Sequence, residues 1–137
     1  MVIRIKDGEF VDEYGRILNL RGVNVAGSSK IPYNSNSISG SSGSEVTFVG
    51  RPFPLSEASL HFTRLRACGY TFIRFIVTWE AIEHAGPGIY DTEYLDYIRQ
   101  VLEKASEFGI RVFIDPHQDV WSRWTGGDGA PLWTLEV

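Results

Sequence analysis

Polar side chains follow each of the apolar runs that the sequence predicts to be strands. Those after the first run are Asn24, Ser28, Ser29 and Lys30. Those within and after the second run are Arg74, Trp79, Glu80 and Glu83. Those after the third run are Asp115, His117, Gln118, Asp119, Trp121, Arg123 and Trp124. This mixture suits a neutral, polyhydroxylated ligand, because polar groups bind its hydroxyls and aromatic faces stack on its C–H surfaces.

Arg74 is the least ordinary of these residues, because it interrupts the apolar run 70–79, which is typical of a strand buried on both faces. A buried guanidinium must be paired, since an unpaired buried charge costs several kcal/mol. Arg74 therefore either orients a carboxylate of the site and lowers its pKa, or it forms an ion pair with no catalytic part. The residues alone leave both interpretations open.

His117 and Asp119 follow the third strand closely and are candidates for one pocket. A single histidine is more often a satisfied structural residue than a ligand, and Asp119 has the alternative of capping a turn. Lys30 lies in a polar loop, where a solvated surface charge is the default interpretation. No second His or Cys stands at a ligand spacing from His117, so the sequence predicts neither a metal site nor a cofactor.

Two further sets of residues also have two interpretations. Glu80, Glu83 and Asp115 include candidates for a catalytic carboxylate, but no spacing singles out a pair. The tryptophans near the end of the chain form either a platform for sugar stacking or a small hydrophobic cluster; they are Trp121, Trp124 and Trp133.

The elements that must position these residues alternate between strand and helix. Alternating apolar residues around Asp7-Gly8 predict an N-terminal β-hairpin. Strands are predicted over 21–25, 70–79 and 110–114, with amphipathic helices over 56–68 and 92–108 between them. This order predicts an α/β fold with a parallel sheet of βαβ units. A doubly wound sheet has the same order, but no Gly-x-Gly-x-x-Gly follows a strand.

Composition excludes several classes of protein. The net charge is −4, and no cluster of Lys or Arg favours binding to nucleic acid or to an anionic membrane. The single cysteine, Cys68, excludes an internal disulfide and is expected to be buried in an apolar pattern. No apolar run reaches the roughly 18 residues of a membrane span, and the first residues contain no secretory apolar region. We therefore expect a cytoplasmic protein, with peripheral membrane association left open.

The whole range 1–137 is predicted to be one unit, because no linker divides it. The Ser-, Gly- and Asn-rich segment 34–51 is predicted to be a flexible insertion loop. A complete (β/α)8 barrel needs about 250 residues, so a barrel interpretation requires this chain to be a part of one. Such a part exposes sheet edges and apolar surface, and we expect it to self-associate.

Several segments, taken together, resemble the opening half of the glycoside hydrolases of family 5 in order and spacing. They are Arg21–Asn24, Gly69–Phe75, Trp79–Glu83, Gly86–Asp91 and Ile114–Asp119. Within the family, the segments His117–Arg123 and Ser28–Lys30 resemble the endoglycoceramidase-related branch. Fungal members of that branch are β-glucosidases acting on glucosylceramide or on steryl β-glucosides.

The resemblance implies an N-terminal β-hairpin followed by the first three βα units of a (β/α)8 TIM barrel. It also implies a retaining hydrolysis of O-glycosidic bonds by two glutamates about 5–5.5 Å apart. In the family these glutamates end the fourth and seventh strands, so neither lies in this chain, and the chain alone is expected to be inactive. Arg74 matches the arginine that supports the nucleophile, and Lys30, His117 and Asp119 match sugar-binding groups.

Two alternatives remain beside this interpretation. The first is a truncated, non-catalytic paralogue that binds a sugar or a partner through the same loops. The second is another kind of (β/α)8 enzyme that uses Glu80 or Asp115. The residues do not distinguish a ceramide from a sterol aglycone, nor do they give the oligomeric state.

Overall fold

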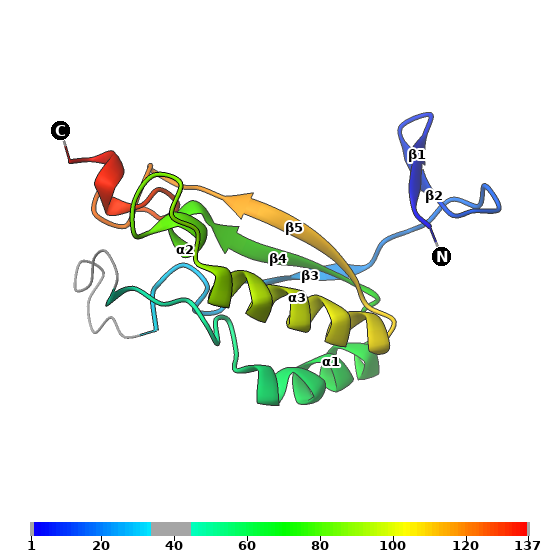
Figure 1. The fold of residues 1–137 in the computed structure, drawn as a ribbon. Helices are drawn as coiled ribbons and strands as arrows, with labels where there is room; N and C mark the ends of the chain where they lie inside the picture. Colours follow the sequence, from blue (N-terminus) through cyan, green and yellow to red (C-terminus); the bar gives the residue numbers. More distant parts are fainter. Residues whose placement is uncertain (1, 34–44, 137) are drawn as a thin grey trace.

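A parallel three-stranded sheet forms the centre of the computed structural model, which describes residues 2–33 and 45–136. Its strands are β3 (Gly22–Val25), β4 (Phe72–Thr78) and β5 (Arg111–His117), adjacent in chain order. Helix α1 (Ala58–Ala67) connects the first two, and α2 (Trp79–Glu83) and α3 (Thr92–Glu107) connect the last two. Helices α1 and α3 cover the same face of the sheet (Figure 1). The predicted α/β alternation is therefore confirmed.

The hydrophobic core lies between this sheet and its helices. Every second residue of β4, namely Ile73, Phe75 and Val77, is buried on the helical side, as the period of two in a strand requires. Helix α3 meets them with the apolar stripe that its periodicity predicted, which includes Tyr94, Ile98, Val101 and Ala105. Burial of this stripe stabilises the packing of α3 against the sheet.

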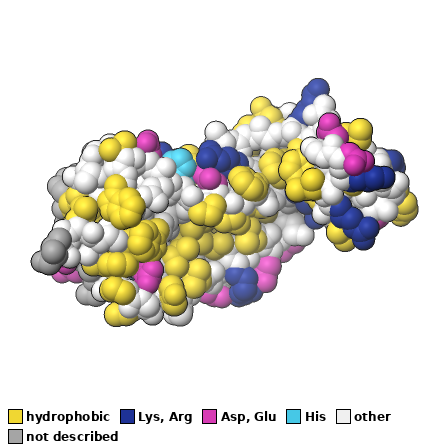
Figure 2. Space-filling model, turned by 90° about the horizontal axis from the view of Figure 1, so that it is seen from above, with side chains coloured by type: hydrophobic (Ala, Val, Ile, Leu, Met, Phe, Trp, Pro, Cys, Tyr) yellow, Lys and Arg dark blue, Asp and Glu magenta, His cyan; other side chains and the backbone are white. Residues whose placement is uncertain are grey.

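The opposite face of the sheet is open in part, so the expectation that β4 is buried on both faces holds for its second half: Ile76 and Thr78 are 3% and 1% exposed. The rest of this face is less covered in the described residues. Phe113 of β5 is 53% exposed and the side chain of Arg74 is 36% exposed. Both residues line a hollow of about 540 Å³ together with Leu20 and Phe72. Seen from above, hydrophobic side chains gather along the middle of the molecule (Figure 2).

Helix α3 begins and ends where its local sequence predicted. The side chain of Asp91 accepts a hydrogen bond of 2.8 Å from the backbone N–H of Tyr94 and so caps the first turn. Gly109 follows the helix with a φ of 66°, a left-handed conformation that favours glycine. By contrast, α1 begins after the short 3-10 helix Leu55–Glu57 without a side-chain cap.

The predicted N-terminal hairpin is present. Strands β1 (Arg4–Lys6) and β2 (Glu9–Val11) pair antiparallel around Asp7 and Gly8, whose φ values of 52° and 84° are those of a type I′ turn. The hairpin lies beyond the amino end of β3, away from the C-terminal segment of the chain (Figure 1). It therefore takes no part in the candidate site.

The predicted insertion loop 34–51 is only partly within the described residues, because 34–44 lie outside them. In the remaining part, Val46 is 3% exposed and Phe48 is fully buried. The ring of Phe48 meets that of Tyr94 edge to face at 6.1 Å. The end of the segment is thus attached to the core.

Strand β5 is longer than the sequence indicated. It continues past Ile114 through Asp115 and Pro116 to His117, and in this extension Val77 of β4 stands opposite Pro116 and Thr78 opposite His117. Proline cannot donate a hydrogen bond to a sheet, but β5 is an edge strand of the described sheet, where proline is tolerated. His117 is consequently held by the sheet itself.

Candidate active site

Arg74 and Asp115 form an ion pair on the open face of the sheet. Asp115 stands opposite Ile76, two residues beyond Arg74, so both side chains lie on the same face. Arg74 Nη2 is 2.7 Å from Asp115 Oδ2. The partner that the sequence required for Arg74 is therefore a carboxylate of the neighbouring strand.

His117 meets the same carboxylate from the other side. Its Nδ1 lies 2.9 Å from Asp115 Oδ2, and its side chain is 18% exposed. Since an ionised carboxylate only accepts hydrogen bonds, this distance indicates a proton on Nδ1. Asp115 thus fixes the orientation of both Arg74 and His117.

Asp128 continues the series to Lys30. Lys30 Nζ is 3.0 Å from Asp128 Oδ2, and His117 Nε2 is 3.5 Å from Asp128 Oδ1. Asp128 itself is only 5% exposed. Arg74, Asp115, His117, Asp128 and Lys30 thus form a series in which basic and acidic side chains alternate at the carboxyl ends of the strands, and we term it the ion-pair chain.

Of the four residues that the resemblance assigns to the site, Asp119 is the one whose side chain is outside the ion-pair chain. Its carboxylate is exposed, and within the described residues it forms no ion pair. Its backbone, however, exchanges two hydrogen bonds of 2.8 Å with the backbone of Asp128. Asp119 therefore lies beside the ion-pair chain, and its carboxylate is accessible to a ligand from solvent.

Asp128 is the residue of this cluster that the sequence prediction missed. It lies in an irregular loop, where no periodicity indicates which side chains turn inward. The signal was its glycine neighbours: a Cβ on Gly127 would collide with the carbonyl oxygen of Asp119, and one on Gly129 would come within 2.7 Å of Gln118 Cγ. Only glycines allow this close backbone approach.

Glu80 and Arg123 form a separate, buried ion pair. Arg123 Nε lies 2.9 Å and 3.0 Å from the two carboxylate oxygens of Glu80, and both residues are 2% exposed. Burial raises the pKa of the Glu80 carboxyl, although the Arg123 guanidinium acts in the opposite direction. The guanidinium also stacks 3.8 Å above the ring of Trp124. Enclosed in this way, Glu80 fits a structural role better than a catalytic one.

Three tryptophans form a cluster. It contains Trp121 and Trp133 of the predicted set, together with Trp79 in place of Trp124. Trp79 meets Trp133 edge to face at 5.4 Å and Trp121 at 6.3 Å. Trp79 and Trp121 remain 37% and 44% exposed. Trp121 and the preceding Val120 have φ values of 71° and 45°, an unfavourable conformation for large side chains. The cluster therefore combines packing with an exposed aromatic surface.

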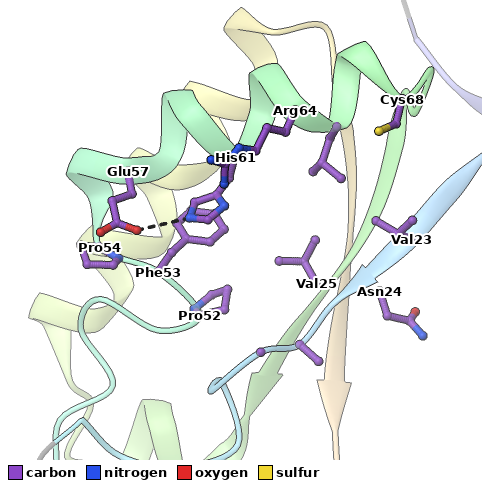
Figure 3. A pocket seen from close by; sticks show the side chains of 13 residues that line it. Val23, Asn24, Val25, Pro52, Phe53, Pro54, Glu57, His61, Arg64 and Cys68 are labelled. Atoms are coloured by element: carbon purple, nitrogen blue, oxygen red, sulfur yellow. Dashed lines mark hydrogen bonds and ion pairs between the residues drawn. The ribbon is translucent and has the colours of Figure 1, made fainter.

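A separate groove of about 510 Å³ lies between β3 and α1 (Figure 3). It is mainly apolar, and its polar pair is His61 and Glu57, 3.3 Å apart. Cys68, expected to be buried, is exposed at this groove. The groove shares no residue with the ion-pair chain, so we do not assign the site to it.

Residues 2–33 and 45–136 contain no group of three His, Cys, Asp or Glu side chains that could hold a metal ion. No helix among them is long and apolar enough to cross a membrane.

Parallel strands with helices on one face define an α/β domain, and its polar side chains gather at the strands' carboxyl ends, where such folds place their sites. The family model for Cellulase (glycosyl hydrolase family 5) matches residues 12–132. The chain therefore belongs to glycosyl hydrolase family 5, as the resemblance in its sequence predicted.

Curated relatives match nearly the whole chain. The chain is 53% identical to a glucosylceramidase of Rhizopus delemar over 93% of its length. It is 44% identical to the ergosteryl-beta-glucosidase of Saccharomyces cerevisiae over 94% of its length. It covers only 20% and 18% of these two proteins, so it spans about a fifth of the curated relatives that it matches.

Solved structures agree with this assignment. Sterylglucosidase 1 of Cryptococcus neoformans superimposes with a TM-score of 0.82 at 50% identity, over 93% of this chain and 19% of that one. An endogalactoceramidase superimposes with a TM-score of 0.69 at 28% identity, over 96% of this chain and 29% of that one. The chain thus corresponds to part of a family 5 barrel enzyme.

Proposed function

We propose that the chain is the N-terminal segment of a retaining β-glycosidase that hydrolyses glycolipids, with glucosylceramide or a steryl β-glucoside as substrate. Relatives with both kinds of name match nearly the whole chain. A neutral sugar joined to a large apolar aglycone also suits the site, where charged side chains adjoin exposed tryptophans.

In this proposal, β3, β4 and β5 are the first three strands of the (β/α)8 barrel. The open face of the sheet, with Arg74 and Phe113, then lines the barrel interior. The acid/base and nucleophilic glutamates come from later strands, as the family resemblance implies, at the short separation of a retaining enzyme. The 137-residue chain alone therefore hydrolyses nothing.

Arg74 supports the nucleophilic glutamate of the complete enzyme. Its ion pair with Asp115 uses the terminal nitrogen Nη2. A guanidinium has five N–H donors, so others remain for a second carboxylate. Asp115 fixes the guanidinium so that it favours the ionised, nucleophilic form of that glutamate.

Lys30, His117 and Asp119 bind the sugar hydroxyls. Lys30 and His117 are oriented by the ion-pair chain, and the exposed carboxylate of Asp119 is available as an acceptor. An uncharged sugar hydroxyl can accept a hydrogen bond from Lys30 or donate one to Asp119, so a neutral glycoside can bind both charged groups. The observation that carries the proposal is this single network, because it links Arg74, His117 and Lys30 at the carboxyl ends of the strands.

The test is hydrolysis by the full-length protein. Glucosylceramide, a steryl β-glucoside and 4-nitrophenyl β-glucoside are incubated with it, and 4-nitrophenyl α-glucoside serves as the stereochemical control. We expect release of glucose from the β-linked substrates, with NMR detecting the β anomer first because the mechanism is retaining. Release of the α anomer first would exclude retention, and sugar binding without turnover would favour the non-catalytic alternative.

A further inference from the structure

We propose that Asp128 is a positioning residue of the sugar site, acting through Lys30 and His117. This inference rests on the proposed function, since it assigns a part to a residue that would not itself touch the reacting atoms. Asp128 Oδ2 lies 3.0 Å from Lys30 Nζ, and Oδ1 lies 3.5 Å from His117 Nε2. One carboxylate therefore faces two of the proposed sugar-binding groups.

The burial of Asp128 makes these contacts more than a surface ion pair. Its side chain is 6% exposed, against 36% for Lys30 and 18% for His117. A carboxylate so enclosed is stable only beside positive or hydrogen-bonding groups, because its desolvation costs several kcal/mol. Asp128 is thus the fixed residue of the Asp128–Lys30 pair, and its carboxylate determines the position of the flexible lysine ammonium group.

The backbone of the loop holds Asp128 rigidly. Asp128 exchanges two backbone hydrogen bonds with Asp119, and the carbonyl of Gly129 accepts one of 2.7 Å from the N–H of Glu80. Gly127 and Gly129 leave no space for side chains against Gln118 and Asp119, which directly follow β5. The carboxylate is therefore placed by the segment after β5 and the start of α2 together.

The contact with His117 shows why position matters here. Nε2 of His117 and Oδ1 of Asp128 are both buried, and neither has a hydrogen-bond partner among the described residues. Asp115 holds the other nitrogen, Nδ1, at 2.9 Å. The ring is enclosed between two carboxylates, and small displacements of one would turn it. A displacement of about 1 Å at a reacting site can reduce the rate by about 100-fold.

Asp128→Asn in the full-length enzyme tests this role, because the substitution keeps the shape and removes the charge. We expect kcat/KM for 4-nitrophenyl β-glucoside to fall by about 100-fold, mostly in kcat. The matched control is Asp12→Asn, at a buried aspartate that pairs with Arg16 outside the ion-pair chain. Asp12→Asn should leave kcat/KM unchanged, and Asp128→Asn should lower Tm no more than this control does.

A double-mutant cycle separates positioning from a general structural role. If Asp128 acts through Lys30 as well as His117, the double variant Lys30→Met/Asp128→Asn loses less activity than the product of the two single losses, whereas independent losses multiply to within about twofold. Multiplying losses, an Asp128→Asn enzyme of normal kcat/KM, or a loss explained by a larger fall in Tm would each overturn the inference and leave the proposed function standing. A wild-type enzyme without β-glucosidase activity would remove both.

Discussion

Arg74 illustrates how much a single residue type in an unusual place can indicate. A charge within an apolar strand required a partner, and the partner is Asp115, 2.7 Å away. The sequence included Asp115 only as one of three undistinguished carboxylates, because pairing between strands depends on the register of the sheet. Asp128 was missed for a related reason, since its contact with Lys30 joins two irregular loops.

Arg74→Lys in the full-length enzyme should lower kcat by about 100-fold. Lysine keeps the charge but lacks the rigid fork of donors that can hold Asp115 and a second carboxylate together. The matched control is Arg99→Lys, at an exposed arginine of α3 that pairs with Asp96 and Glu103. Steady-state kinetics on 4-nitrophenyl β-glucoside check both variants. Equal kcat values for the two would mean that Arg74 has only a structural part.

At the scale of elements, local sequence predicted what local physics determines. Alternation and apolar runs predicted the strands, and the stripe and cap of α3 predicted that helix. The loop after β5 could not be predicted in this way, because it is held by contacts distant in sequence. Arg123, for example, reaches Glu80 at the start of α2. The sequence prediction ended this strand too early. Proline is unfavourable in a central strand, but it is tolerated in an edge strand such as β5.

Glu80→Gln should lower the stability of the full-length protein by about 3 kcal/mol, because it removes the carboxylate charge that pairs with the buried Arg123 guanidinium. Chemical denaturation measures this change. In the fraction that remains folded at low temperature, kcat should stay within tenfold of the wild-type value. A tenfold change in rate corresponds to roughly 1.4 kcal/mol of activation free energy. A variant of normal stability but without activity would instead revive Glu80 as a catalytic candidate.

Two tyrosines of α3 should make the protein sensitive to alkali. Burial raises the pKa of Tyr94 and of Tyr97 well above the usual value, and the nearby groups Tyr97 and Asp91 add to the effect on Tyr94. Unfolded tyrosine ionises near pH 10, so their contribution is complete below about pH 10 and is lost as the pH rises toward the folded values. Melting temperatures measured from pH 8 to pH 12, roughly the range spanning that value, should therefore fall at the alkaline end.

The same two residues provide a matched comparison at neutral pH. The hydroxyl of Tyr97 donates a 2.6 Å hydrogen bond to the carbonyl of Phe53, whereas that of Tyr94 has no partner among the described residues. Tyr97→Phe should therefore cost about 1 kcal/mol, and Tyr94→Phe nearly nothing. Both variants should flatten the alkaline fall in Tm. An unchanged alkaline fall in the double variant would contradict this explanation.

The sheet has two edges and part of one face that the described residues leave uncovered. Strands β3 and β5 each pair on one side only within those residues. The face of the sheet opposite the helices exposes Phe113, and the apolar groove beside β3 is open. In a closed barrel such edges and faces are covered by the remaining strands. A chain that covers a fifth of its relatives thus has a core on the helical side and an unsatisfied face on the other.

The 137-residue chain, expressed alone, should therefore self-associate. Sedimentation velocity measures this as a concentration-dependent increase in the sedimentation coefficient. Phe113→Lys should weaken the association, because it places a charge on the open face where the aromatic ring is 53% exposed. Leu95→Lys is the control, since Leu95 is 40% exposed but lies on α3, on the helical side. Edge-to-edge pairing alone would persist in both variants, so an effect specific to Phe113→Lys identifies the open face as the contact. A monodisperse, cooperatively melting monomer of the unmodified chain would contradict the prediction, because the uncovered sheet would then be stable in water without the rest of the barrel.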